Sequence, residues 1–374
     1  MSDELSAQQV RFLRMVGQHL HDPDEKPSLI DVVRSVFGIN AQQTLPMMLS
    51  LRARIAGLTR EDVDKAIVGT RRLVRTWAMR GTIHLLDAGD VRWLIPMLGP
   101  LFIAKGRKRR ADLGLSEEII SKGLGEIRIA LNGAEPMTRW ELMDSLSEKG
   151  LVLDRKTQAP IHLIQYANLD GLTCMGPYRE NGEPTYVLFD EWIGDKVMEA
   201  REVGSARLAR RYLDGYSPAS VKDFAAWSGI PAGDAKKAVN AVADTQDILE
   251  VDVNGKSMWV SREKLPLLRK PLPKHILKLL PAFDSYLLGY ADRELIVPAE
   301  YRKEIYHGGQ TVAALLVDGA VAGVWKYERR GRRLSVTISP FESYGDAPRD
   351  LLLEGAGDVA RFLGYHSEVD INVV

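Results

Sequence analysis

The sequence predicts an α+β fold assembled from repeated small units, and three observations carry this prediction. An order of helices followed by a β-hairpin recurs three times within residues 1–264. Asn-Gly pairs, which favour tight hairpin turns, stand between apolar-alternating segments at residues 181–182 and 254–255. Residues 281–374 are mostly strand-like. Because helices followed by a hairpin are typical of a winged helix-turn-helix unit, we expect three such units in tandem and a C-terminal β-domain, either barrel-like or an open sheet with a helix packed on it.

The first unit is expected at residues 1–110 and ends in a basic connector. Residues 73–87 are rich in β-branched and aromatic side chains around Arg80-Gly81, which predicts a hairpin. Its helices are delimited by capping and stop residues: Ser6, Ser28 and Thr59 as caps, Pro46 near a helix start, and Gly38 and Gly57 as helix ends.

The second and third units are expected at residues 111–200 and 201–264. Each should contain a recognition helix, the helix that this kind of unit places in the DNA major groove. The expected helices are residues 137–150, 159–171, 206–216, 220–230 and 233–245, of which 159–171 and 233–245 are the recognition-helix candidates, and the expected hairpins are residues 172–192 and 247–263.

The C-terminal domain is expected at residues 265–374. A basic, proline-punctuated linker at residues 264–280 leads into it. An Asp318-Gly319 pair between two apolar-alternating stretches predicts a further hairpin turn, with a strand on each side. The remaining expected elements are a strand at 332–341, a helix at 350–365 and a β-rich end at 366–374.

The composition excludes several classes of protein. The chain has 374 residues, of which 45% are hydrophobic and 27% charged, so it is not a disordered chain. Its single cysteine, Cys174, excludes a disulfide framework and a cysteine-rich zinc site. The N-terminus has no apolar leader region and no stretch reaches the roughly 18 apolar residues of a membrane span. We therefore expect a cytoplasmic protein with no membrane partner.

The charge balance argues against a tail-driven nucleic-acid binder, because 50 Lys+Arg offset 50 Asp+Glu. Local basic clusters nevertheless predict a DNA-binding face, with acidic segments such as Asp22–Glu25 on the opposite side. The alternative for winged-helix units, which also serve in protein interaction, stays open. The candidate DNA-binding residues include Arg75, Arg80, Lys105, Arg107, Arg109, Arg110, Lys236, Lys237, Arg329, Arg330, Arg332 and Arg333.

Five segments spread over the chain carry a family resemblance: residues 38–58, 73–90, 212–230, 279–293 and 317–326. In content and order they resemble the AlkZ/YcaQ family of bacterial DNA glycosylases. The resemblance implies three winged-helix units and a C-terminal β-domain that form a C-shaped molecule around a DNA channel. It also implies a monomer associated with the bacterial nucleoid, acting on double-stranded DNA with alkylated purines, without a metal or cofactor.

The family's catalytic Gln-Φ-Gln (or Gln-Φ-Asp) motif matches Asn40, Ala41 and Gln42 here. Asn40 replaces the first Gln and keeps the carboxamide, but its side chain is about 1.5 Å shorter, the length of one C–C bond. A register that uses Gln42 and Gln43 lacks the apolar spacer. The structural alternative is that Asn40 and Gln42 only satisfy backbone groups in the turn between two helices.

The residue types of this motif suit one kind of chemistry. Alkylation at N7 or N3 gives a purine a positive charge, so the base leaves as a neutral molecule and the sugar becomes oxocarbenium-like. The site then has only to position a water, which carboxamides can do because each is both donor and acceptor. The prediction is a monofunctional glycosylase for cationic or bulky alkylpurines, with interstrand crosslinks as a further candidate substrate. The alternatives are an inactive winged-helix DNA-binding or regulatory protein, and a resistance factor for one natural genotoxin.

Further residues are predicted from the same segments. Arg80, Thr82 and His84 form the family's Arg-Gly-Thr-x-His stretch, which either contacts DNA near the flipped nucleotide or makes a tight turn with His84 half-buried in a strand. Arg293, in an Asp-Arg pair, either contacts DNA or belongs to a structural ion pair. Trp227 is expected in the core.

Overall fold

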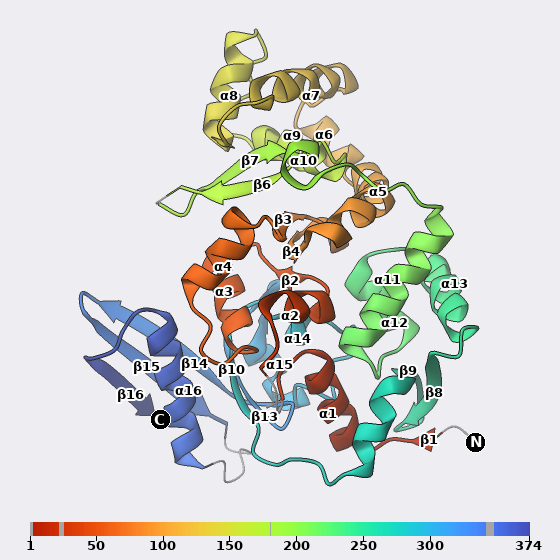
Figure 1. Cartoon of the computed structure of the whole chain (residues 1–374), viewed down its shortest axis with the longest axis vertical. Helices are drawn as coiled ribbons and strands as arrows, with labels where there is room; N and C mark the ends of the chain where they lie inside the picture. The colour runs from red at the N-terminus through yellow and green to blue at the C-terminus, as the bar shows by residue number, and fades with distance from the viewer. Residues whose placement is uncertain (1–2, 22–25, 180, 342–347) are drawn as a thin grey trace. The chain divides into compact units, whose positions relative to one another are not determined.

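The computed structural model describes residues 3–21, 26–179, 181–341 and 348–374 (Figure 1). Its contacts divide the chain into two compact units. Unit 1 consists of Met1–Val63 and Ala206–Val374, and unit 2 consists of Asp64–Ser205. The division into four domains made from the sequence stays a prediction. The acidic segment Asp22–Glu25 lies outside the described residues.

The N-terminus packs on a hairpin that is distant in sequence. Helix α1 (Ala7–Gly17) begins at Ser6, whose capping box with Gln9 confirms the predicted cap. Strand β1 (Asp3–Glu4) pairs in parallel with β8 (Ile248–Val253), which pairs with β9 (Lys256–Ser261) in an antiparallel hairpin. A buried core joins these elements through Leu5, Val10, Leu13, Val251, Val253, Met258 and Val260.

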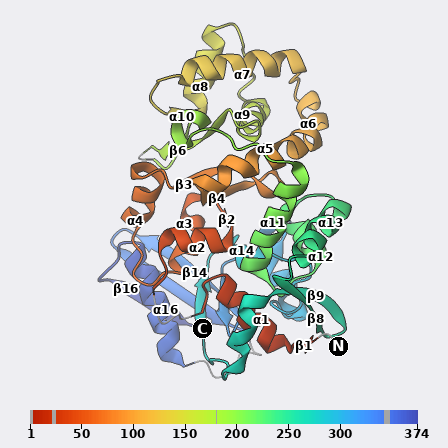
Figure 2. The ribbon, with the colours of Figure 1, turned by 45° about the vertical axis from the view of Figure 1, so that its right-hand side comes forward.

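The three helices before this hairpin lie where the sequence predicts them: α11 (Arg201–Tyr216), α12 (Val221–Ser228) and α13 (Ala232–Ala243) (Figure 2). Ser220 caps α12 in a capping box with Asp223. The hairpin turn has positive φ at both central residues, 52° at Asn254 and 75° at Gly255, as an Asn-Gly turn of this type requires. Trp227 is buried among Tyr212, Tyr216 and Phe224, which confirms its core position.

One of the two predicted helix ends in the N-terminal part of unit 1 is confirmed and the other is wrong. Helix α2 (Leu29–Val36) stops at its C-cap Phe37, a fully buried residue in the left-handed conformation, and Gly38 follows directly with φ 110°. Helix α3 (Thr44–Arg52) ends well before Gly57. Between and after these helices lie β2 (Ile39–Asn40) and α4 (Arg60–Asp64).

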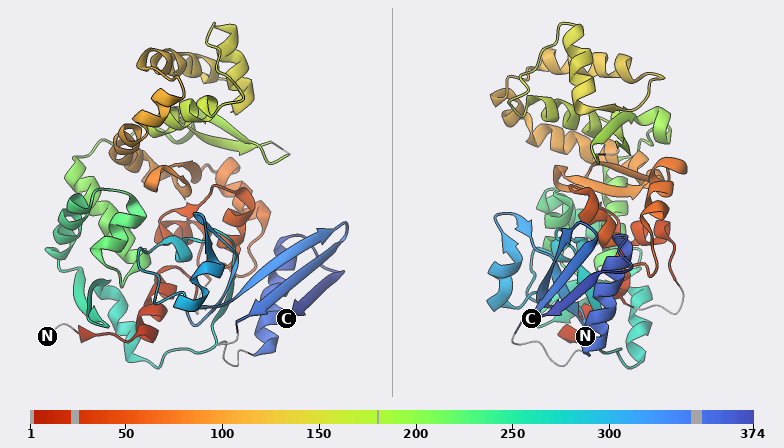
Figure 3. Two further views of the ribbon diagram at one scale, coloured as in Figure 1. Left: turned by 180° about the vertical axis from the view of Figure 1, so that it is seen from behind. Right: turned by 90° about the vertical axis from the view of Figure 1, so that its left-hand side faces the viewer.

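The C-terminal part of unit 1 is an open five-stranded sheet covered by α16 (Arg349–Phe362) (Figure 3). Its strand order is β10, β13, β14, β15, β16, and no pairing among the described strands closes it into a barrel. The predicted linker is partly wrong because its last residues form β10, which pairs with β13 over four residues. The elements are η3 (Arg262–Arg269), β10 (Leu277–Leu280), α14 (Ser285–Leu288), η4 (Ala299–Tyr301), α15 (Arg302–Ile305), β11 (Tyr306–His307), β12 (Gln310–Thr311), β13 (Ala314–Val317), β14 (Ala320–Arg330), β15 (Arg333–Pro340) and β16 (Val369–Val373).

Unit 2 contains an antiparallel sheet in the order β4, β3, β6, β7, β5, with helices packed beside it (Figure 2). Both hairpins predicted here are confirmed. Helices α5, α6 and α7 were not predicted. The elements are η1 (Lys65–Gly69), β3 (Leu73–Trp77), η2 (Met79–Gly81), β4 (Ile83–Asp87), α5 (Ala88–Lys105), α6 (Arg107–Asp112), α7 (Glu117–Leu131), β5 (Met137–Thr138), α8 (Arg139–Glu148), α9 (Ala159–Leu169), β6 (Thr173–Tyr178), β7 (Pro184–Leu188) and α10 (Phe189–Ile193).

Across the described ranges, no helix is both long and apolar enough to cross a membrane. Nor do the described His, Cys, Asp and Glu side chains gather in a group of three or more that could hold a metal ion.

Candidate active site

The Asn40–Gln42 loop is anchored by its apolar residues and presents a polar one. Phe37, Ile39 and Ala41 are completely buried. Gln42 is exposed, and Asn40 keeps only 8% of its surface. Of the two carboxamide residues of the motif, Gln42 is therefore accessible from outside, whereas Asn40 is largely enclosed.

Hydrogen bonds fix the backbone of this loop. The Asn40 N–H donates to Ser285 Oγ at 3.2 Å, and that hydroxyl donates to the Gly38 carbonyl at 3.1 Å. The Asn40 Oδ1 accepts from the Gln42 N–H at 3.4 Å. The structural alternative is therefore partly realised for Asn40, since its carbonyl oxygen orders the backbone of Gln42.

The Gln42 carboxamide makes no hydrogen bond to any of the residues that the structure describes. It is thus available as donor and acceptor to a water or a substrate. Gln43 is also exposed and stands at the start of α3 without a side-chain capping bond. The structure thus leaves the Gln42–Gln43 register open beside the Asn40–Gln42 one.

A buried ion pair supports the residue that holds the loop. The Arg54 guanidinium donates two hydrogen bonds of 2.8 Å to the two carboxylate oxygens of Asp284, and both side chains are completely buried. Asp284 also accepts from Ser50 Oγ at 2.6 Å and from the Tyr286 N–H at 2.9 Å, which caps α14. This places Ser285, the next residue, against the loop.

Electrostatics keep Asp284 ionised. Burial by itself would raise the pKa of this carboxyl, but the Arg54 charge and the hydrogen bonds from Arg54, Ser50 and Tyr286 hold its pKa below the usual value. Asp284, Ser285 and Arg54 were not predicted from the sequence. The Asp-Ser pair before Tyr-Leu-Leu carries a helix-cap signal, but nothing local identifies Arg54 as the partner.

Segment 279–293 meets three of the other four family-like segments inside unit 1. Besides Gly38 and Asn40, it reaches segment 317–326, because Tyr286 donates to the Gly319 carbonyl at 2.9 Å. It reaches segment 212–230 as well, because the Ala291 N–H donates to Asp223 at 2.9 Å. The structure therefore brings together residues that the sequence presents as separate motifs.

The Arg-Gly-Thr-x-His stretch lies in unit 2 as the tip of the β3–β4 hairpin. Arg80 and Gly81 both have positive φ, 57° and 68°, which confirms the tight turn. The Gln165 side chain of α9 donates to the Gly81 carbonyl at 3.2 Å and holds the turn. Thr82 donates its hydroxyl to the Met79 carbonyl.

His84 is 1% exposed, and its Nδ1 lies 2.9 Å from the Thr82 carbonyl oxygen. Burial, together with the smaller effect of the Arg80 charge, lowers the pKa of His84 to about 3. The ring is therefore neutral near pH 7. Arg75, on β3, is also buried and stacks on Tyr178 at 4.8 Å. Such buried side chains offer DNA little surface.

The remaining candidate DNA-binding residues differ in exposure. Lys105, Arg107 and Arg109 are exposed at the end of α5 and on α6, whereas Arg110 is 5% exposed. Arg109 donates to Gln158 at 2.9 Å. Exposed basic residues elsewhere are Lys236 and Lys237 on α13, and Arg329, Arg330, Arg332 and Arg333, here named the turn arginines, where β14 turns into β15.

Arg293 is half-buried and lies 4.1 Å from the centre of the Tyr306 ring. Asp292 forms its ion pair with Lys256, at 2.7 Å. Arg293 lines a pocket of about 410 Å³ together with three other basic side chains, Lys222, Arg302 and Lys303, beside Asp292. This arrangement suits a phosphate group.

The chain is similar to known DNA glycosylases. The family model described as "DNA glycosylase AlkZ-like" matches residues 33–362. A curated relative from Streptomyces sahachiroi, an interstrand DNA cross-link repair glycosylase, is 29% identical over 381 residues, with 99% of each chain covered. The solved structure of Streptomyces sahachiroi DNA glycosylase AlkZ matches with a TM-score of 0.83 at 26% identity, covering 99% of this chain and 100% of that one.

Proposed function

The chain belongs to the AlkZ-like DNA glycosylase family, as its sequence motifs indicate, and on this premise we propose that it hydrolyses the N-glycosidic bond of cationic or bulky alkylpurines in double-stranded DNA. The observation that carries the proposal is the Gln42 carboxamide, exposed on a loop whose backbone is fixed by Ser285. Since its curated relative is an interstrand cross-link repair glycosylase, crosslinked purines are the second substrate class that we propose.

The proposed chemistry needs no strong acid or base. A purine alkylated at N7 or N3 leaves as a neutral base, and the oxocarbenium-like sugar is attacked by water. Gln42 holds that water through its amide oxygen and nitrogen. Asn40 acts as a positioning residue, because its Oδ1 binds the Gln42 N–H at 3.4 Å. No lysine lies in the motif to form a Schiff base, so the product is an abasic site and a free base.

DNA contacts are proposed for the exposed basic side chains. These include the turn arginines, Lys105, Arg109, Lys236 and Lys237, and the half-buried Arg80 and Thr82 at the hairpin tip are proposed as contacts as well. The pocket at Arg293 offers a phosphate site. The proposal retains the winged-helix interpretation of α11, α12, α13 and the β8–β9 hairpin, in which α13 presents Lys236 and Lys237 to the duplex.

The test is excision of 7-methylguanine and of a nitrogen-mustard crosslink from a duplex, detected as abasic sites. Gln42→Ala should lower the single-turnover rate at least about 100-fold, because a poorly placed water loses most of the benefit of positioning. Gln43→Ala is the matched control and should retain the rate. If Gln43→Ala abolished excision and Gln42→Ala did not, the other register would be correct.

The rival function is a DNA-binding or regulatory protein that has lost catalysis. The observation in its favour is that the carbonyl oxygen of Asn40 is already bonded to the backbone. Tight duplex binding with no abasic product on any cationic lesion would establish the rival and refute the proposed enzyme.

A further inference from the structure

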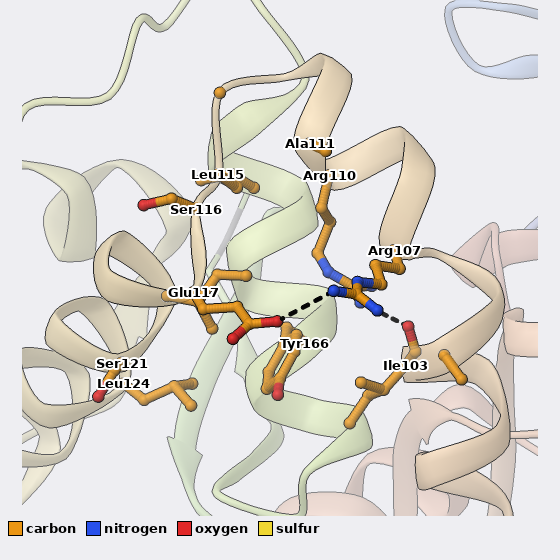
Figure 4. Close-up of a pocket in the computed structure, with 13 residues that line it drawn as sticks. Ile103, Arg107, Arg110, Ala111, Leu115, Ser116, Glu117, Ser121, Leu124 and Tyr166 are labelled. Atoms are coloured by element: carbon orange, nitrogen blue, oxygen red, sulfur yellow. Dashed lines mark hydrogen bonds and ion pairs between the residues drawn. The ribbon is translucent and has the colours of Figure 1, made fainter.

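Unit 2 contains a cavity of about 730 Å³ that the glycosylase proposal does not use (Figure 4). It lies between the end of α5, helix α6, the start of α7 and helix α9. Its volume falls within the range of about 300–1,000 Å³ that is usual for small-molecule sites.

Arg110 is the cationic centre of this cavity. The residue is 5% exposed, donates through Nη2 to the Ile103 carbonyl and lies 5.0 Å from the centre of the Tyr166 ring. No carboxylate among the described residues pairs with its charge. Its Nε has no hydrogen-bond partner either, but that atom is enclosed by protein and does not face the cavity. Because a buried charge without a counter-charge is unfavourable, the guanidinium favours an anion as occupant of the cavity.

Arg107 stands at the mouth of the same cavity. Figure 4 shows its side chain beside that of Arg110, with Glu117 on the opposite wall. The Arg107–Glu117 pair is 3.6 Å long, and both side chains are more than four-fifths exposed. Exposed pairs of this kind are weak, so an incoming anion can replace Glu117 as the partner of Arg107.

The start of α7 also borders the cavity. Ser116, whose hydroxyl caps this helix of 15 residues, lines the cavity, and Glu117 and Glu118 stand in the first turn. The N-terminal end of a helix attracts negative charge, but these two carboxylates already occupy that position. The attraction for an anionic ligand therefore comes from Arg110 and Arg107.

The other walls are apolar. Ile103, Leu115, Ile120 and Leu124 line the cavity with the ring of Tyr166. A DNA phosphodiester would satisfy the arginines but leave these side chains uncovered. We propose that the cavity binds a small amphipathic anion, an apolar or aromatic body that carries one phosphate or carboxylate group.

The experiment is calorimetric titration of the full chain with 1-naphthyl phosphate. We expect one site per chain, with 1-naphthol and inorganic phosphate each binding at least about tenfold more weakly, since each lacks one half of the proposed ligand. Arg110→Met should weaken 1-naphthyl phosphate at least about tenfold, because a charge-assisted contact is lost. Lys108→Met removes an exposed charge on the same helix and should leave the affinity unchanged.

A second variant tests the site without removing the arginine. A Cβ added at Gly106 would lie 2.5 Å from Arg110 Nη1, so Gly106→Ala should displace the guanidinium and weaken binding at least about tenfold. Gly125→Ala on α7 meets nothing within 4 Å and is its control. Glu117→Gln should tighten binding by removing the competing carboxylate, whereas Glu118→Gln on the same helical turn should not.

Two results would overturn the proposal. One is 1-naphthyl phosphate binding that is absent or unaffected by Arg110→Met and Gly106→Ala. The other is displacement of an undamaged duplex by saturating 1-naphthyl phosphate, which would make the cavity a DNA phosphate contact. Duplex affinity that is unchanged in Gly106→Ala and in the presence of the probe supports a separate small-molecule site.

Discussion

Removal of the Asp284 charge should destabilise unit 1 strongly. In Asp284→Asn the side chain keeps an acceptor for the Tyr286 N–H, but the Arg54 guanidinium remains buried without its counter-charge. Breaking a buried pair by changing one partner costs about 3–5 kcal/mol. Because both side chains are completely buried and the contact is bidentate, we expect the free energy of unfolding to fall by this amount and not by the smaller amount typical of a surface ion pair.

The coupling energy between Arg54 and Asp284 distinguishes an unpaired buried charge from a general packing defect. The double variant Arg54→Met/Asp284→Asn removes the unpaired charge and should be more stable than Asp284→Asn alone. The measurement is the free energy of unfolding in urea at pH 7 for the wild type, both single variants and the double variant.

The pH dependence follows from the lowered pKa of Asp284. Its folded-state pKa lies below the unfolded value of about 3.8, so the stabilisation is present above pH 4 and is lost as the pH falls through the folded-state value. The gap between wild type and Asp284→Asn should therefore narrow below pH 4. Asp292→Asn, at an exposed ion pair, is the control and should leave the unfolding midpoint nearly unchanged. A double variant no more stable than Asp284→Asn would refute the reasoning.

Three further predictions concern pH, catalysis and DNA. Burial lowers the pKa of Lys264 from 10.5 to about 7. Between pH 7 and pH 10.5 the ammonium is therefore protonated in the unfolded chain and neutral in the folded chain, so the free energy of unfolding rises with pH in this range. Lys264→Met should raise the unfolding free energy at pH 6 by about 3–5 kcal/mol and remove this rise, whereas a rise of equal size in the variant would contradict the assignment. Asn40→Ala should lower the excision rate about 5–10-fold while Asn40→Asp, which keeps the acceptor for the Gln42 N–H, retains it; equal loss in both would mean that the amide nitrogen matters. Ala substitution of all four turn arginines should weaken binding to any duplex and flatten its salt dependence in fluorescence anisotropy, and an unchanged salt slope would exclude this contact.

Local chemistry made much of the secondary structure predictable. Ser6 and Ser220 both form the capping boxes that their neighbours allow, and the Asn254-Gly255 turn has the positive φ values that its sequence favours. Signals of this kind involve residues three or fewer positions apart, so no tertiary information is needed to recognise them.

Helix α5 shows where the local signal fails. Asp87 caps its start by accepting from the Gly89 N–H, which is a local signal, but Pro96 and Pro100 interrupt the apolar residues, so the sequence shows no clean stripe. Gly99 is required by a tertiary contact, because a Cβ at this position would lie 1.8 Å from the Leu169 carbonyl oxygen of α9. The close approach of α5 and α9 explains why a glycine stands here, and this contact could not be predicted from residues 88–105 alone.

The candidate site, too, could be predicted from the sequence only in part. The motif Asn40-Ala41-Gln42 could be located from the sequence, but the groups that fix it, Ser285 and the Arg54–Asp284 pair, come from positions more than 200 residues apart. A buried charge must have a partner, yet spacing along the chain does not say which arginine provides it. It follows that segments 38–58 and 279–293 are coupled through buried polar contacts. Substitutions in one should therefore be non-additive with substitutions in the other, whereas changes at the exposed turn arginines should add independently.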